Sequence, residues 1–431
     1  MLDIKFIREN PEKVKEAARN KRAKVDIDAA LMLDTEHREV LQKLEVLRAQ
    51  QNKKSKEAQG GSEELKKLKA DIQGLEKQEV KLKAELERML LLVPNIPLEM
   101  VPVGKDESEN VVVREVGKKN QFDFTPKDYL TIAEKLDIID IERASKVSGS
   151  RFGYLKREAA LLEFALVQYT FRALGDASIL KKIIESNSAL AGIEPTPFIP
   201  VVPPVMIKPD VMRKMARLEP VEERYHIPAD DLYLVGSAEH TLGSMHMDET
   251  FAEKDLPRRY IGFSTAFRRE AGSYGKDTKG ILRVHQFDKL EVESFCLPEL
   301  SRKEHEFIVA CQEYLMQGLG IPYRVVEICT GDMGGPDARQ IDLEAWMPGQ
   351  NSGEYRETHT ADLMGDYQAR RLRTKVKRTG GKTEFVHMVD ATAFAIGRTL
   401  IALIENRQTK DGGFKVPEAL WPYVPFQEVK P

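Results

Sequence analysis

The chain has 431 residues, of which 42% are hydrophobic and 31% are charged. This length and hydrophobic content predict roughly two or three folded domains, and they exclude a disulfide-stapled miniprotein and a globally disordered chain. Lysine and arginine together number 66, against 69 aspartate and glutamate residues. Because these charges nearly balance, a polyanionic partner would have to bind local basic patches rather than a global positive field.

The three cysteines, Cys296, Cys311 and Cys329, are far apart and form no CxxC motif. We therefore expect core thiols and a reducing, cytoplasmic location, with neither a zinc ribbon nor a disulfide framework. The sequence has no run of about 18 apolar residues that would predict a transmembrane helix. The residues after Met1 lack the apolar core of a signal peptide, so we expect no membrane partner.

Two segments near the N-terminus, residues 28–58 and 65–89, repeat apolar or long side chains with a period of about 3.5 residues. Such a narrow seam predicts two paired helices, and Gly60–Gly61–Ser62 between them predicts a tight turn. The seam residues are Leu33, His37, Val40, Leu44, Leu47, Gln51, Leu65, Leu68, Ile72, Leu75, Leu82, Leu86 and Met89. We therefore predict an N-terminal antiparallel coiled-coil hairpin.

Two functions are compatible with this charged hairpin. It could be a solvated spacer or dimerisation arm, which is the commoner role of such helices, or an arm that contacts the phosphates of an RNA. Long cationic side chains run up to and around the predicted tip. These candidate RNA-binding residues are Lys43, Arg48, Lys53, Lys54, Lys66, Lys67 and Lys69.

The composition changes after the second helix. A proline-spaced stretch through Asn110 predicts a linker, and beyond it short apolar runs alternate with turns and with amphipathic helices at 159–174 and 302–319. This mixture predicts an α+β domain. The predicted division of the chain is a helical arm at 1–100, a linker at 101–120 and the α+β domain at 121–431.

The usual glycine-rich phosphate-binding motifs are missing from the sequence. There is no GxxxxGK[ST] and no GxGxxG between a strand and a helix. A nucleotide, if one binds, would therefore have its phosphates held by arginines. Two segments carry arginines in suitable surroundings.

The first segment, residues 263–291, predicts a strand, a glycine-containing loop and a second strand, and thus an antiparallel hairpin. Arg268 and Arg283 would lie on facing strands, aimed at one anion. Phe287 would share a strand face with His285 and Arg283, since they are spaced by two residues. An aromatic ring beside arginines suits a base stacked above phosphates, while cations on the rim of a sheet are the alternative.

The second segment, residues 389–406, leads from small residues into an apolar helix that Arg398 interrupts. A buried arginine needs a partner. That partner could be a carboxylate such as Glu405 or the anion of a ligand, and the sequence alone leaves both possibilities open.

Together these segments resemble the seryl-tRNA synthetases of class II, and the resemblance extends over nearly the whole chain. The matching motifs are Met1–Pro11, the helical hairpin, Val147–Phe152 with Pro203–Pro204 at the limits of the first class II motif, Phe267–Glu270 with Arg283–Phe287 in the second, Gly397–Thr399 with Glu405–Asn406 in the third, and Asp366–Arg371. The resemblance implies a class II antiparallel sheet with flanking helices, a tRNA-binding arm and a homodimer.

The resemblance also implies an activity, that of a serine–tRNA ligase. Serine would be activated with ATP to seryl-adenylate and transferred to the 3′ end of serine tRNA, with selenocysteine tRNA left open as a further acceptor. The implied ATP-binding residues are Arg268, Glu270, Arg283, Phe287, Glu357 and Arg398, of which Arg268, Arg398 and Glu357 are the candidate catalytic residues. The implied serine-binding residues are Ser237, Glu239, Arg268, Glu291, Asp390 and Thr392. Mg²⁺ would be held by Glu357 and Thr360, and tRNA by the seven cations of the hairpin.

Three departures from the family pattern fall in the amino-acid pocket. Ser237 stands where threonine is usual, Asp390 replaces an asparagine, and Asp362 adds a negative charge near the metal residues. An aspartate cannot donate a hydrogen bond unless it is protonated. These departures leave two alternative functions, a paralogue with another amino acid or acceptor and a non-catalytic RNA-binding derivative.

Overall fold

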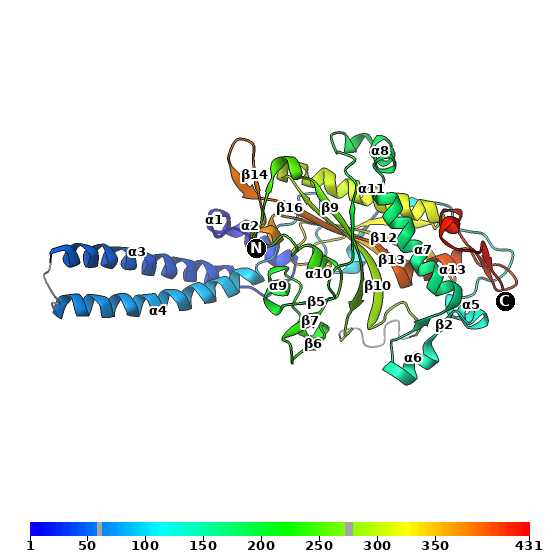
Figure 1. Ribbon diagram of the computed structural model, residues 1–431, viewed down its shortest axis with the longest axis horizontal. Coiled ribbons are helices and arrows are strands. Elements are labelled where there is room, and N and C mark those ends of the chain that lie inside the picture. Colours follow the sequence, from blue (N-terminus) through cyan, green and yellow to red (C-terminus); the bar gives the residue numbers. More distant parts are fainter. Residues whose placement is uncertain (58–62, 272–278) are drawn as a thin grey trace. The chain divides into compact units, whose positions relative to one another are not determined.

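The computed structural model describes residues 1–57, 63–271 and 279–431. These residues form two compact units, Met1–Ile96 and Pro97–Pro431. Figure 1 shows the helical first unit in blue and the second unit around its large sheet.

The first unit is helical. Its helices are α1 (Ile4–Glu9), α2 (Pro11–Asn20), α3 (Ile27–Glu57) and α4 (Glu63–Leu92). Helices α3 and α4 lie side by side in opposite directions (Figure 1), and Val40 and Leu44 of α3 are buried with Ile72 and Leu82 of α4. The predicted helical hairpin is therefore confirmed, whereas its Gly60–Ser62 turn lies outside the described residues.

The candidate RNA-binding cations of this hairpin are exposed, with the exception of the half-buried Lys54. Lys54 pairs with Glu64 at 2.8 Å, and Arg48 pairs with Glu76 at 2.7 Å. Ion pairs between such exposed side chains are weak, so a polyanion could readily replace the carboxylates.

The second unit contains an eight-stranded sheet with the strand order β1-β11-β12-β13-β16-β10-β9-β4. Neighbouring strands are antiparallel, except that β4 runs parallel to β9. The strands, in sheet order, are β1 (Val111–Val116), β11 (Tyr323–Glu327), β12 (Arg339–Met347), β13 (Glu354–Gly365), β16 (His387–Ala395), β10 (Gln286–Cys296), β9 (Arg258–Phe267) and β4 (Ile199–Val201).

Shorter strands form small accessory sheets. They are β2 (Ile139–Asp140), β3 (Tyr154–Leu155), β5 (Met206–Ile207), β6 (His226–Ile227), β7 (Leu232–Leu234), β8 (Thr250–Ala252), β14 (Lys375–Lys377), β15 (Thr383–Phe385), β17 (Phe414–Lys415) and β18 (Glu428–Val429). The helices are α5 (Tyr129–Leu136), α6 (Ile141–Ser148), α7 (Arg157–Leu174), α8 (Ala177–Glu185), α9 (Pro209–Lys214), α10 (Glu239–Leu242), α11 (Ser301–Leu319), α12 (Tyr367–Leu372) and α13 (Ile396–Asn406).

Three helices build the main core on one face of the large sheet (Figure 1). Helix α11 packs against β13 and β16, α13 packs against β12 and β10, and α7 packs against α13. The buried side chains of this core include Phe307, Leu315, Leu400, Leu343 and Val389. Within the described parts of the chain, none of the helices has the length and apolarity needed to cross a bilayer.

The structure confirms the predicted α+β fold with an antiparallel sheet. The helices predicted at 159–174 and 302–319 are α7 and α11. Residues 101–120, where the sequence predicts a linker, include the edge strand β1, which pairs with β11. The backbone of that strand completes the sheet edge although its side chains are largely exposed.

A buried ion pair fastens α11 to the sheet. Arg259 of β9 donates to both carboxylate oxygens of Glu304, at 2.6 and 2.8 Å, and the two side chains are 0% and 1% exposed. The remaining donors of Arg259 reach the carbonyls of Glu194 and Thr196 at 2.8 Å each, and Ser294 donates to Glu304 at 2.7 Å. Every charge in this network has a partner. Removing one partner should therefore lower the free energy of unfolding by more than the ion pair contributes to it, because the remaining charge would be buried alone.

We predict that Glu304→Ala lowers the free energy of unfolding by about 3 kcal/mol, since it leaves a buried guanidinium without its carboxylate. Urea unfolding of the full chain measures this. The matched control, Arg302→Ala at an exposed position of the same helix, should change stability by less than about 0.5 kcal/mol. Equal effects of the two substitutions would contradict the prediction.

Candidate active site

Alternation along β16 separates the apolar core from a polar face of the sheet. Val389 and Ala391 belong to the core that the helices cover. Because successive side chains of a strand point to opposite faces, Asp390 and Thr392 lie on the other face. The candidate site residues gather there.

Two adjoining cavities lie on this polar side. The first, of about 170 Å³, is lined by all the candidate ATP-binding residues, namely Arg268, Glu270, Arg283, Phe287, Glu357 and Arg398, and also by Thr392. The second, of about 500 Å³, is lined by Arg217, Glu239, Thr360 and Asp362 among others. Arg268, Glu270, Arg283 and Lys289 line both cavities, which therefore adjoin each other in one cleft region.

The hairpin of β9 and β10 carries two of the arginines, although not where the sequence predicts them. The strands are paired antiparallel up to Phe267 opposite Gln286, which confirms the hairpin, while residues 272–278 of its loop lie outside the described residues. Arg268 and Arg283 lie just beyond the paired strands rather than on them, because the ladder ends before it reaches either residue. The predicted common strand face of Arg283, His285 and Phe287 is wrong for the same reason, and only Phe287 belongs to β10.

Two of the arginines in the first cavity contact other residues that the sequence predicts to bind ATP. Arg283 donates to the Glu270 carboxylate at 2.6 Å. The Arg268 guanidinium lies 5.4 Å from the centre of the Phe287 ring, and its Nε donates to a backbone carbonyl at 3.1 Å. These contacts fix the cations before any anion arrives, which favours electrostatic binding without reorganisation.

Arg398, in the first turn of α13, pairs with a residue of the site. Its Nη1 lies 3.2 Å from Glu357 Oε2 and donates to the Glu357 carbonyl at 2.8 Å. Glu405, the alternative structural partner, instead accepts hydrogen bonds from the backbone N–H groups of Tyr129 and Gly349. The guanidinium of Arg398 therefore faces the cleft.

A β-bulge in β13 brings the two candidate metal ligands together. The pairing of β13 with β12 skips Thr358, which is the extra residue of the bulge. An extra residue reverses the alternation of side chains, so Glu357 lies on the same face as Thr360. In a regular strand these two residues, three positions apart, would point to opposite faces.

The second cavity has a lysine and several carboxyl groups near its floor. Lys289 donates to Glu291 at 2.8 Å and to Ser237 Oγ at 3.4 Å. Glu239 starts α10 and is 8% exposed. Burial alone would raise the pKa of the Glu239 carboxyl, but the nearby Arg217 outweighs it and holds that pKa well below its usual range.

The strand register places three carboxyl side chains in one row across the sheet. Asp362 of β13 lies opposite Asp390 of β16, which lies opposite Glu293 of β10. All three are buried, and like charges directly opposite one another destabilise a sheet. Burial, reinforced by the neighbouring carboxylates, raises the pKa of each of these groups well above its ordinary value. Protons on some of these groups, together with a neighbouring cation, relieve the repulsion within this row.

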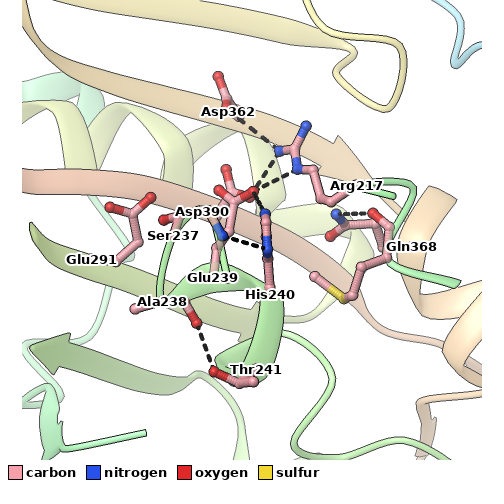
Figure 2. Close-up of polar contacts among 12 residues, drawn as sticks. Arg217, Ser237, Ala238, Glu239, His240, Thr241, Glu291, Asp362, Gln368 and Asp390 are labelled. Atoms are coloured by element: carbon pink, nitrogen blue, oxygen red, sulfur yellow. Dashed lines mark hydrogen bonds and ion pairs between the residues drawn. The ribbon is translucent and has the colours of Figure 1, made fainter. Parts of the chain in front are cut away.

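Arg217 supplies that cation (Figure 2). It follows α9, and its guanidinium lies 2.5 Å from Glu239 Oε1, 3.2 Å from Asp390 Oδ2 and 3.8 Å from Asp362 Oδ2. Arg217 cannot be predicted from the sequence, because no spacing rule connects it to partners so distant along the chain. Lys289 is not among the predicted site residues, although the alternation of side chains along a strand would place it on the same face as Phe287 and Glu291.

This constellation on a largely antiparallel sheet defines a class II aminoacyl-tRNA synthetase. The family described as tRNA synthetase class II core domain (G, H, P, S and T) matches residues 222–407. The family described as seryl-tRNA synthetase N-terminal domain matches residues 1–97, which include the helical hairpin.

Relatives that match the chain over its full length identify the family within this class. The chain is 42% identical over 442 positions to the serine–tRNA ligase of Dictyoglomus turgidum, with 100% of each chain covered. The crystal structure of seryl-tRNA synthetase from Pyrococcus horikoshii complexed with ATP is similar with a TM-score of 0.88 and 39% identity, again over 100% of both chains. The cytoplasmic serine–tRNA ligase of Naegleria fowleri in complex with AMP gives a TM-score of 0.84 and 32% identity over 100% of this chain and 99% of that one. The chain belongs to the seryl-tRNA synthetase family.

The buried His359 of β13 predicts an acid-sensitive fold. Burial lowers the pKa of His359 to about 3, because its imidazolium would lack solvation. Below a pH of about 6.5 the unfolded chain binds a proton at this residue that the folded chain does not, so stability falls as the pH drops from about 6.5 towards 3. We predict that His359→Gln reduces this pH dependence by up to about 1.4 kcal/mol per pH unit in urea unfolding experiments. Parallel stability profiles for the variant and the parent chain would contradict the assignment.

Proposed function

We propose that the chain is a cytoplasmic serine–tRNA ligase that activates serine with ATP and then transfers the seryl group to the 3′ end of a serine tRNA. The observation that carries this proposal is the contact between two adjoining cavities, in which Arg268 lines both the cavity of the candidate ATP-binding residues and the cavity that contains Glu239. Adenylate formation requires the alignment of an amino-acid carboxylate with a phosphate, and two adjoining cavities with a shared arginine would favour that alignment.

The first cavity suits ATP. In the activation step the serine carboxylate attacks the α-phosphate and pyrophosphate leaves, so negative charge develops on phosphate oxygens. Arg268 lines both cavities, and it would bridge the serine carboxylate and the α-phosphate. Arg283 and Arg398 would bind the β- and γ-phosphates, while Phe287 would stack on the adenine and Glu270 would accept from its amino group.

The second cavity suits the small, polar amino acid. Its ammonium group would face Glu239, which Arg217 keeps ionised. Glu291 and Thr392 would bind the serine hydroxyl, with Ser237 and Asp390 completing the pocket. Glu291 and Thr392 lie opposite each other on β10 and β16, so two neighbouring strands would read a single hydroxyl group.

Magnesium would bind on the bulged face of β13, through Glu357 and Thr360. Oxygen ligands of this kind, completed by phosphate oxygens, are those that Mg²⁺ prefers. Among residues 1–57, 63–271 and 279–431, no cluster of three His, Cys, Asp or Glu side chains is arranged to hold a metal ion by itself, so such an ion would depend on the ATP phosphates. When bound, it would neutralise charge developing on those phosphates.

We further propose that residues 1–100 act as a tRNA-binding arm on a catalytic domain at 121–431, and that the enzyme is a homodimer. The exposed cations of α3 and α4 support the first point. Leu161 and Phe164 of α7 support the second, since these large apolar side chains are 46% and 54% exposed and lie in the segment that resembles the first class II motif.

One alternative keeps the chemistry but changes the amino acid. The buried Asp362 and Asp390 favour it, because they alter the hydrogen-bonding capacity of the pocket. A non-catalytic derivative is disfavoured by the cleft, in which Arg268, Arg283 and Arg398 are held in place around the cavity.

The purified protein should catalyse ATP–pyrophosphate exchange with serine. With threonine, alanine, glycine or cysteine we expect exchange at least about 100-fold less efficient, since each substrate either lacks the hydroxyl or changes the size of the side chain. Efficient exchange with another amino acid would support the paralogue. Failure of all five substrates would support the non-catalytic derivative.

The arm should act on tRNA alone. We predict that combining Lys66→Gln, Lys67→Gln and Lys69→Gln raises the KM for tRNA about 10-fold at moderate salt and flattens its salt dependence, because phosphate contacts release counterions. Serine-dependent pyrophosphate exchange should be unchanged. The matched control is Lys181→Gln with Lys182→Gln on the exposed face of α8. Equal losses in tRNA charging for the two variants would contradict the role of the arm in tRNA binding.

A further inference from the structure

We propose that Arg217 is a positioning residue that controls where the amino-acid pocket binds the substrate ammonium. Its guanidinium holds the Glu239 carboxylate towards the substrate ammonium, and it prevents the carboxyl row of Asp362, Asp390 and Glu293 from competing for that ammonium. The proposal rests on the proposed function in one respect, namely that the pocket binds the amino acid.

The backbone around Arg217 is fixed on both sides. Its N–H donates to the Met212 carbonyl at 3.1 Å, and its own carbonyl accepts from Arg224 Nε at 2.8 Å. The preceding Ala216 has φ +58°, a left-handed conformation that is uncommon for residues other than glycine. The side chain is only 16% exposed. These backbone hydrogen bonds and the burial of the side chain therefore fix the position of Arg217 in the pocket.

A single guanidinium serves several carboxyl groups. The Arg217 guanidinium contacts Glu239, Asp390 and Asp362, and its Nη2 also lies 3.9 Å from Asp337 Oδ1. Lys289, which also lines the second cavity, pairs with Glu291. A planar guanidinium can direct donors to carboxylates on different elements, which a lysine ammonium at the same place could not match. Arg217 is thus the group that links Glu239 of α10 to the row on β13 and β16.

The row contains groups that would seek a cation if Arg217 were absent. Both carboxyl oxygens of Glu293 and Oδ1 of Asp390 are buried and accept no hydrogen bond from the described residues. Without Arg217, the ammonium of the substrate would meet several carboxyl groups besides Glu239 that could ionise next to it. By occupying Asp390 and Asp362, Arg217 leaves Glu239 as the carboxylate at which the ammonium is expected.

The geometry predicts a defined coupling between Arg217 and Asp390. Removing the positive charge with Arg217→Gln leaves Glu239 and Asp390 without their shared cation, so binding of the amino acid should suffer. Asp390→Asn removes one of the two carboxylates, and its carboxamide can still donate a hydrogen bond to a neighbouring carboxylate. The second substitution should therefore relieve the first.

The test is a double-mutant cycle on the full chain, read by pyrophosphate exchange at varied serine and ATP concentrations. We expect Arg217→Gln to raise the KM for serine at least about 10-fold, while the KM for ATP and kcat change less than about 3-fold. In the Asp390→Asn background the same substitution should raise the KM for serine less than about 3-fold. Arg213→Gln, an exposed position on the preceding helix, is the matched control and should leave all three parameters unchanged.

The proposal would be overturned by a KM for serine that does not respond to Arg217→Gln, or by an equal rise of that KM in both backgrounds. A parallel rise in the KM for ATP would show a general structural role instead, and would also overturn it. If the parent chain shows no serine-dependent exchange, the proposed function fails on its own. Urea unfolding of the same four proteins then decides the Arg217–Asp390 coupling, because Arg217→Gln should destabilise the parent chain more than the Asp390→Asn chain.

Discussion

A charged group withdrawn from water must meet an opposite charge or change its protonation state, and the polar face of the large sheet is organised by this constraint. Arginines that suit phosphates are paired with Glu270 and Glu357, and the carboxylate that suits an ammonium is paired with Arg217. Each pair orients its members before a substrate arrives. A substrate of complementary charge then exchanges one ionic partner for another, and few side chains need to be reoriented.

The register of the strands decides which charges meet. The bulge at Thr358 turns Glu357 to the face of Thr360, and the pairing of β16 with its neighbours sets Asp390 between Asp362 and Glu293. A regular ladder would have turned Glu357 to the opposite face of the sheet. On the other face, the buried pair of Arg259 and Glu304 fastens α11 to the same sheet. The arrangement of side chains in the cleft thus depends on the bulge in β13 and on the register of the strands, in a sheet against which the helices pack.

Much of the fold could be predicted from the sequence, because hydrophobic period is a local signal. The seam of residues 28–58 and 65–89 predicts α3 and α4, and the amphipathic patterns predict α7 and α11. The sequence does not predict the edge strand β1, because the apolar and polar residues of VVVREV do not alternate as they do in a half-buried strand. The residues of the first cavity came from motif resemblance, and the structure brings all of them around one space.

What the sequence could not supply was the pairing of charges. The contact between Arg217 and Asp390 joins residues 173 positions apart, so no local spacing could reveal it. For the same reason the sequence cannot decide whether Arg398 pairs with Glu405 or with the anion of a ligand, whereas in the structure Arg398 lies beside Glu357. Bulges were equally inaccessible, because one extra residue in a strand has no reliable signature in composition. Positions on faces could be inferred from alternation only where the ladder is regular.

In the proposed function, the two adjoining cavities bind the nucleotide and the amino acid together, and the second cavity recognises the serine hydroxyl. The most direct measurement is the calorimetric dissociation constant of a non-hydrolysable seryl-adenylate analogue beside its alanyl counterpart. The account predicts that the seryl compound binds at least about 100-fold more tightly, because a pocket built to hydrogen-bond a hydroxyl rejects a ligand without one. Equal affinity for the two compounds would contradict it.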